Sequence, residues 1–329
     1  MKIHESVGLT YDDVLVRPGY SELSSRQDAN FMVTNSPLHE KPLAPIIVAN
    51  MKTLATVEMA YALDELGIMV PSHRFQRTID QEVFHITYTS TTTPEAASIG
   101  VKERERTEKL AEHIDVFFLE LAHADNKYAI QEIKWLKATF PDKKLVVGNV
   151  ATGDAAKRLF DAGADVVKVG IGPGAVCTTR LVTGCGVPQV SALIECAAEG
   201  PVIADGGIRN SGDIVKALVA GATFVMIGSL FAGTDETAGD KFNKKVMYYG
   251  MASREAGKVS DGNVPEGISH VVPYAGSAAG VARDLLAGVR QGMAMVGVST
   301  LEELREKAEL QLVSVNSVIE NQPHIRFRV

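Results

Sequence analysis

Short, nearly continuous runs of apolar and β-branched residues recur along the chain, separated by segments of mixed polarity. Parallel strands that are buried on both faces have this pattern, whereas strands with one exposed face alternate apolar and polar residues. The spacing leaves room for a helix between successive runs, which predicts repeated strand–helix units. The eight runs are Pro45–Ala49, Gly67–Pro71, Ala97–Val101, Val116–Leu121, Leu145–Asn149, Val166–Val169, Val202–Ala204 and Phe224–Ile227.

The segments between the runs carry helical signals. Asp125–Thr139 places its isoleucines near one stripe, and Ser211–Ala220 opens with a serine suited to capping and ends before Gly221. One unit also recurs, because Ala162–Gly170 resembles Ala220–Gly228 as helix end, glycine, buried strand and glycine. Eight such units fit a closed barrel better than an open sheet, so we predict an α/β fold of the (β/α)₈ TIM-barrel type.

Two segments do not fit a minimal barrel. Residues 1–42 are polar and rich in turn residues, and we expect them to include a cap over one end. Ala232–Gly276 follows the eighth run and contains many glycines, which is typical of a catalytic flap. No segment has the composition of a linker to a second domain. We therefore expect a single domain over residues 1–329.

Charge and cysteine usage narrow the function classes. A formal net charge of −7 argues against nucleic-acid or anionic-membrane partners, although backbone N–H groups can still bind a phosphorylated small molecule. The three cysteines are odd in number and form no CxxC pair, which argues against a disulfide framework or a structural zinc site. No run of apolar residues is long enough to cross a membrane or to form a signal sequence. We expect a cytoplasmic protein.

The run Lys168–Arg180, KVGIGPGAVCTTR, holds the strongest chemical signal. It leaves the sixth predicted strand through a glycine-rich turn and presents Cys177, with Thr179 two residues later. Catalytic residues of barrels lie at the carboxyl ends of the strands, but a lone cysteine is more often buried and inert, so both interpretations remain open. The turn's carbonyl groups could also surround a monovalent cation. Cys185 and Cys196 lack such a setting, and we expect them to be structural.

Glycine turns at two neighbouring strand ends suggest a phosphate site. Ile203–Ile208 ends the seventh predicted strand with Asp-Gly-Gly, and Met226–Ser229 ends the eighth with a further glycine. Barrels commonly bind phosphate after strands seven and eight, through backbone N–H groups. Asp205 would then be free to hold ribose hydroxyls. The alternative is that these glycines serve only the geometry of the turns.

Four stretches together resemble one family, that of IMP dehydrogenase and GMP reductase. They are GLTYDDVLVRPGYS at 8–21, GIGPGAVCTTR at 170–180, IADGGIRNSGD at 203–213 and YYGMAS at 248–253. The resemblance covers nearly the whole chain. It implies a (β/α)₈ barrel, and it implies that Cys177 forms a covalent thioimidate with C2 of a purine nucleotide.

Within that family the chain looks more like the reductases. Dehydrogenases usually insert two CBS modules after the second strand, whereas only Ser72–Ala96 stands here. They also carry an Arg-Tyr pair in the flap, which Arg254–Asn263 lacks. The resemblance therefore implies an NADPH-dependent oxidoreductase that converts GMP to IMP and ammonia. One alternative is a CBS-less IMP dehydrogenase that makes XMP with NAD, because the flap run Val264–Ile268 looks more like that of the dehydrogenases. The other alternative is a non-catalytic nucleotide-binding protein.

The resemblance also assigns residues. It implies that Thr179 and Glu266 form a proton relay to the departing ammonia, and that the protein is a homotetramer. Departures from the family pattern are Glu120, where an Asp is usual, and Ala175, where a Ser is frequent. The implied nucleotide ligands are Asp205, Gly206, Gly207, Gly228, Ser229, Gly250, Met251, Ala252 and Gly267; the implied cofactor ligands are Ser25, Arg26, Arg74, Glu120, Leu121, Ala122, Ile171 and Gly172; and the turn of Gly172, Gly174 and Cys177 is a candidate K⁺ site.

Arg26 and Arg74 are the candidates for the phosphates of NADPH, because a guanidinium fork suits such oxygens. Each could equally be a solvated surface arginine.

Overall fold

The computed structural model describes residues 3–4, 6–75, 83, 91–238, 245–250, 252–253 and 264–321. Its main sheet has seven parallel strands in the order β2-β8-β7-β6-β5-β4-β3. Seven of the eight predicted runs therefore form its strands. The strands are β2 (Ile46–Val48), β3 (Ala96–Ile99), β4 (Val116–Glu120), β5 (Lys144–Val150), β6 (Val166–Val169), β7 (Val202–Asp205) and β8 (Phe224–Ile227).

The remaining predicted run, Gly67–Pro71, stands between the two ends of this sheet. It forms no regular strand, but Met69 makes a parallel bridge to Ile47 of β2, and Ser72 makes one to Ala97 of β3. The backbone N–H of Ser98 donates to Ser72 at 2.8 Å. These contacts join β2 to β3 through the second run. The predicted (β/α)₈ barrel is confirmed, with the eighth position reduced to isolated bridges.

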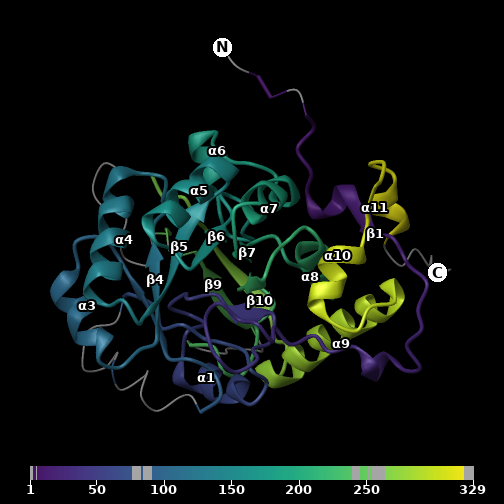
Figure 1. Ribbon diagram of the computed structural model, residues 1–329, viewed down its shortest axis with the longest axis horizontal. Coiled ribbons are helices and arrows are strands. Elements are labelled where there is room, and N and C mark those ends of the chain that lie inside the picture. The colour runs from purple at the N-terminus through teal and green to yellow at the C-terminus, as the bar shows by residue number, and fades with distance from the viewer. Residues whose placement is uncertain are drawn as a thin grey trace.

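Helices surround the strands (Figure 1). The predicted helix at 125–139 is observed from Lys127, with Asn126 as its N-cap. The prediction of Ser211 as a cap is wrong: the side chain of Asn210 accepts the N–H of Asp213 instead. The helices of the barrel and its C-terminal extension are α1 (Val57–Asp64), α3 (Arg104–Ala111), α4 (Lys127–Thr139), α5 (Gly153–Ala162), α6 (Thr179–Thr183), α7 (Gln189–Ala197), α8 (Ser211–Val219), α9 (Ala278–Val296), α10 (Leu301–Lys307) and α11 (Ser317–Glu320).

The repeated unit of the sequence is a repeated structure. Gly163 and Gly221 follow α5 and α8 in the left-handed region, with φ of 117° and 108°, and each leads into a fully buried strand. A residue with a Cβ is strained at such a φ, which is why glycine stands at both turns. Each strand then delivers its carboxyl end to the same rim of the barrel.

Among the described residues, two antiparallel strand pairs lie outside the barrel sheet. β1 (Val14–Val16) pairs with β11 (Leu310–Leu312), which brings the N-terminal segment beside the end of the chain and against α8. β9 (Lys245–Tyr249) pairs with β10 (Ser269–Pro273) inside the segment expected to be a flap. Two short 3₁₀ helices, η1 (Tyr11–Asp13) and η2 (Arg26–Asp28), also lie in the part of the chain that the structure describes. None of the helices in the described ranges is long and apolar enough to span a membrane.

Candidate active site

A cavity of about 400 Å³ opens at the carboxyl ends of the barrel strands. Its walls come from the residues that follow or end β2, β4, β6, β7 and β8, together with parts of 245–250 and 264–267. This is the end of a barrel at which enzymes of the fold place their chemistry. Residues expected from the sequence that line it are Arg74, Glu120, Leu121, Ala122, Ile171, Gly174, Cys177, Thr179, Asp205, Gly206, Gly207, Gly228, Ser229, Gly250, Ala252, Glu266 and Gly267.

The loop that carries the cysteine depends on its glycines. Gly170 has a φ of 150°, and a Cβ there would overlap the backbone oxygen of Asp205. Gly172 has a φ of 86° and lies against the side chain of Arg180, whose guanidinium donates to the carbonyls of Ile171 and Val187 at 3.1 and 2.6 Å. The loop is therefore fixed from inside by an arginine that follows it in sequence.

Three side chains form a hydrogen-bonded row at this loop. Cys177 Sγ lies 3.2 Å from Thr179 Oγ1, and Thr179 Oγ1 donates to Glu266 Oε2 at 2.7 Å. The row combines a thiol, a hydroxyl and a carboxylate, which can move a proton towards or away from a group beside the sulfur.

Main-chain hydrogen bonds bring Glu266 to the cysteine loop. Thr178 N–H donates to the carbonyl of Glu266 at 2.8 Å, and Ile268 N–H donates to that of Val176 at 3.0 Å. Cys177 and Gly267 thus form an antiparallel bridge. Glu266 and the cysteine loop are far apart in the sequence, so before the structure only the family resemblance placed them together.

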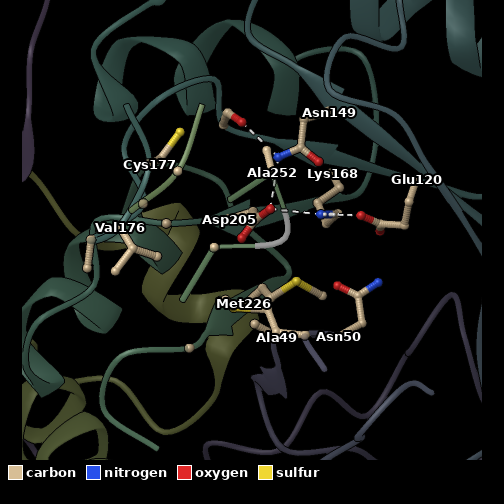
Figure 2. Close-up of a pocket in the computed structure, with 18 of the residues that line it drawn as sticks. Ala49, Asn50, Glu120, Asn149, Lys168, Val176, Cys177, Asp205, Met226 and Ala252 are labelled. Atoms are coloured by element: carbon tan, nitrogen blue, oxygen red, sulfur yellow. Dashed lines mark hydrogen bonds and ion pairs between the residues drawn. The ribbon is translucent and has the colours of Figure 1, made fainter. Parts of the chain in front are cut away.

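A second cluster lies deeper, around Lys168 of β6. Lys168 is 3% exposed, and its Nζ lies 2.8 Å from Asp205 Oδ2 and 3.1 Å from Glu120 Oε2 (Figure 2). Asn149 Nδ2 also donates to Asp205 Oδ2, at 2.8 Å. Burial acts to lower the pKa of Lys168, but the carboxylates of Asp205 and Glu120 outweigh it, and the pKa is raised above its ordinary value. Lys168 is therefore a fixed cation.

The two glycine turns predicted as a phosphate cradle are adjacent in the structure. Gly206 and Gly207 have φ of 95° and 85°, and a Cβ on Gly206 would lie 2.9 Å from the backbone nitrogen of Gly174. Gly228 lies against the hydroxyl of Tyr248. Burial, followed by the charge of Asp205, raises the pKa of Tyr248, so this hydroxyl stays protonated beside the turn. The backbone of the two glycine turns and the hydroxyl of Tyr248 can therefore come close to a ligand.

Four expected site residues are not among those that line the cavity. Ser25 and Arg26 are exposed on the short helix η2, where Ser25 caps its N-terminus. Gly172 packs against Arg180 instead of facing the cavity. Met251 lies outside the described residues. The assignment of Ser25 and Arg26 to the cofactor stays a prediction without support from this cavity.

The residues of the site that sequence reasoning did not assign include Lys168, Asn149 and Tyr248. The one available signal was Lys168, a charged residue inside an otherwise apolar run, since a buried lysine requires a carboxylate partner. The identity of those partners depends on neighbouring strands.

The three cysteines differ in their surroundings. Cys196 is buried in α7, and burial raises the pKa of its thiol to about 12, which agrees with the expected structural role. Cys185 is exposed on the loop after α6, and its expected structural role stays a prediction. Within the described ranges, no group of three His, Cys, Asp or Glu side chains is arranged to hold a metal ion.

Comparison with known proteins agrees with this site. Residues 8–324 match the family model described as "IMP dehydrogenase / GMP reductase domain". A GMP reductase of Phytophthora infestans is 38% identical over 98% of this chain and 96% of its own length. A GMP reductase of Vibrio vulnificus is 37% identical over 93% and 95%, and one of Buchnera aphidicola is 37% identical over 95% and 97%. This chain, with its cysteine loop, glycine turns and barrel, belongs to the IMP dehydrogenase/GMP reductase family.

Proposed function

We propose that this protein is a GMP reductase, which converts GMP to IMP and ammonia with a reduced nicotinamide dinucleotide. The observation that carries the proposal is the row Cys177–Thr179–Glu266 at a cavity that also contains Asp205 and the glycine turns. A nucleophile, a proton donor and a nucleotide-binding surface are three elements that the reaction requires of the protein, in addition to a bound hydride donor. The relatives named GMP reductase, which align over nearly the full chain, support the same activity.

In the binding step, the backbone N–H groups around Gly206, Gly207 and Gly228 would hold the phosphate of GMP, and Asp205 would accept hydrogen bonds from the ribose hydroxyls. The Cys177 thiolate would then add to C2 of the guanine and form a carbon–sulfur bond. The purine ring takes up the electron pair, so C2 becomes tetrahedral while it still carries its amino group.

The amino group must leave as neutral ammonia, because an amide anion is too basic to depart. As Cys177 becomes a thiolate, Glu266 would take up the thiol proton through the hydroxyl of Thr179, with which it shares a 2.7 Å hydrogen bond, and would return that proton along the same path to the departing nitrogen. Once the nitrogen is protonated, the C2–N bond breaks and a thioimidate remains on Cys177. A positioned general acid of this kind contributes about 10²- to 10⁴-fold to the rate.

We propose NADPH as the second ligand, on the side of Glu120, Leu121, Ala122 and Arg74. The cavity fits a further ligand there, because Glu120 Oε1 is buried and has no hydrogen-bond partner among the described residues. When bound, NADPH supplies the hydride that C2 needs as the carbon–sulfur bond breaks, which gives IMP and returns the thiolate. The residues of this chain contribute by holding C2 and by excluding water from the thioimidate.

The K⁺ prediction for Gly172, Gly174 and Cys177 has weaker support. The donors would be neutral carbonyls, which suit K⁺, but the guanidinium of Arg180 already lies against Gly172 and binds the Ile171 carbonyl. A fixed positive charge at the loop disfavours a second cation. We therefore derive no step through K⁺; turnover in potassium compared with tetramethylammonium salts tests whether one is needed.

We also propose a cytoplasmic homotetramer. The three cysteines are free thiols, as a reducing compartment favours, and several large apolar side chains are exposed, including Tyr20 (85%) and Leu181 (86%). Light scattering on the purified protein measures the assembly directly.

One pair of assays tests the activity. The protein is mixed with GMP and NADPH, and separately with IMP and NAD⁺, while the absorbance of the reduced nicotinamide is followed. We expect NADPH consumption with GMP only, matched by equal amounts of IMP and ammonia. Formation of NADH with IMP alone would instead show an IMP dehydrogenase. GMP binding without turnover and without an adduct at Cys177 would show a non-catalytic binding protein.

A further inference from the structure

Lys168 connects two carboxylates that serve different ligands in the proposed function. Asp205 ends β7 on the nucleotide side, and Glu120 ends β4 on the cofactor side. Figure 2 shows the lysine between them, with an ion pair drawn to each. The contacts to both ligand sites therefore meet at one buried ammonium group.

The backbone and Cβ of Lys168 pack closely against the neighbouring strand. They lie beside Gly148 of β5, where a Cβ would lie 2.5 Å from Lys168 Cβ and 2.8 Å from its backbone oxygen. Glycine at position 148 therefore allows strands β5 and β6 to approach each other closely at this point. Asn149 holds Asp205 Oδ2 from the next position and also donates to the carbonyl of Gly170 at 2.7 Å. Four adjacent strand ends, β4 to β7, are joined in this way.

Each carboxylate also keeps capacity for a ligand. Lys168 and Asn149 both bind Oδ2 of Asp205, and neither binds Oδ1. Glu120 contacts Lys168 through Oε2, while its buried Oε1 has no partner among the described residues. An unpaired buried carboxylate oxygen is unfavourable, so it gains from a hydrogen-bond donor on a ligand.

We propose that Lys168 is a positioning residue that couples nucleotide binding to cofactor binding. The assignment of the two ligands rests on the proposed function. A nucleotide that hydrogen-bonds to Asp205 restricts that carboxylate, and through its ion pair restricts Lys168 and then Glu120. The second ligand then meets a carboxylate that is already ordered and loses less of its binding free energy to ordering. Coupling of this kind has a positive sign and is reciprocal.

The test measures binding without turnover. NADPH is titrated into the protein with and without saturating IMP, which lacks the 2-amino group and so leaves the enzyme nothing to expel. The ratio of the two dissociation constants is the coupling factor. For the wild type we expect IMP to tighten NADPH binding by about 5- to 150-fold, and NADPH to tighten IMP binding by the same factor.

The variants separate coupling from folding. Lys168→Met should bring the factor close to one, and Lys168→Arg, which keeps a buried cation, should retain part of it. Because removal of one member of a buried ion pair can destabilise the fold, Glu120→Gln provides a second variant that leaves Lys168 paired with Asp205. It should also reduce the factor. Lys157→Met is the matched control: it removes an exposed lysine of α5 that is paired with Asp161, and the factor should remain at the wild-type value.

The inference is wrong if the wild type shows no coupling, or if folded Lys168→Met and Glu120→Gln both keep the wild-type factor. These outcomes are distinct from failure of the proposed function, which would appear as a wild type that couples the two ligands but does not oxidise NADPH with GMP. A wild type that binds no NADPH in either condition would overturn both.

Discussion

Thr179 donates a 2.7 Å hydrogen bond to Glu266, a residue 87 positions later in the chain. The same hydroxyl lies 3.2 Å from the sulfur of Cys177. A single threonine thus stands between the group that would attack the purine and the group that would protonate its leaving nitrogen.

Replacement of Cys177 by alanine should abolish turnover and leave GMP binding nearly unchanged, because the phosphate and ribose contacts come from other loops. We expect a loss on the order of 10⁴-fold or more in kcat, as is typical when a nucleophile is removed. NADPH oxidation and calorimetric GMP binding measure the two properties. Cys185→Ala, which removes an exposed thiol, is the control and should remain active. Equal loss of activity in both variants would contradict the assignment.

Glu266→Gln should lower kcat by about 10²- to 10⁴-fold, with a much smaller effect on the KM for GMP, because glutamine keeps the shape of the side chain but cannot deliver the proton. Thr179→Val should have a similar effect. Since both residues act in one relay, the double variant should be little slower than the worse single variant. Ammonia release in a single turnover is the direct measurement. A Glu266→Gln enzyme with wild-type kcat would mean that another group is the acid.

Gly206→Ala should raise the KM for GMP and lower stability. The backbone at Gly206 is left-handed, and the new methyl group would press on Gly174 and Pro173, within the loop that carries Cys177. Gly184→Ala is the matched control, because Gly184 also has a positive φ, of 70°, but has no atom within 4 Å of its Cβ position. The conformational strain alone costs about 1–2 kcal/mol in each variant. Thermal unfolding and steady-state kinetics should show a defect in GMP use only for Gly206→Ala.

The stability of the C-terminal region should depend on pH through Glu303. The backbone N–H of Ser299, then Lys307 and the Ser299 hydroxyl, bind its carboxylate and lower the pKa of Glu303 from 4.5 to about 2. A carboxylate with a lowered pKa stabilises the fold above its ordinary pKa, and the contribution is lost as the pH falls through the folded value. Glu303→Gln should therefore unfold at a lower temperature than the wild type near neutral pH. The difference should shrink between pH 4.5 and about 2, and a constant difference over that range would contradict the assignment.

The barrel could be predicted because strands buried on both faces produce continuous apolar runs, whatever their partners. The same reasoning gave Gly67–Pro71 a full strand, although only isolated bridges form, from Met69 to Ile47 and from Ser72, just after the run, to Ala97. An apolar run indicates that a segment is buried. It does not show how many hydrogen bonds the segment makes to its neighbours, because that number also depends on the neighbouring strands. The helix cap was misplaced by one residue for a related reason. Asn210 and Ser211 are both good caps, and the choice depends on which side chain reaches the N–H of Asp213.

The site was predictable where chemistry is local in sequence and not where it is assembled from several strands. The glycine turn around Cys177 can be recognised in the sequence, because few residues other than glycine permit such a loop. Lys168 was visible only as a charge in an apolar run, and its partners Asp205 and Glu120 belong to other strands. Ser25 and Arg26 were assigned from resemblance alone, and the cavity does not include them.

The antiparallel bridge between Cys177 and Gly267 constrains how this protein can vary through evolution. Because neighbouring residues of an extended segment point to opposite sides, a slip of one position would turn the Glu266 carboxylate away from Thr179. Insertions and deletions between the end of β9 and Glu266 are therefore tolerable only if they leave this alignment unchanged. The number of residues in that stretch can change, but the register in which Gly267 pairs with Cys177 cannot.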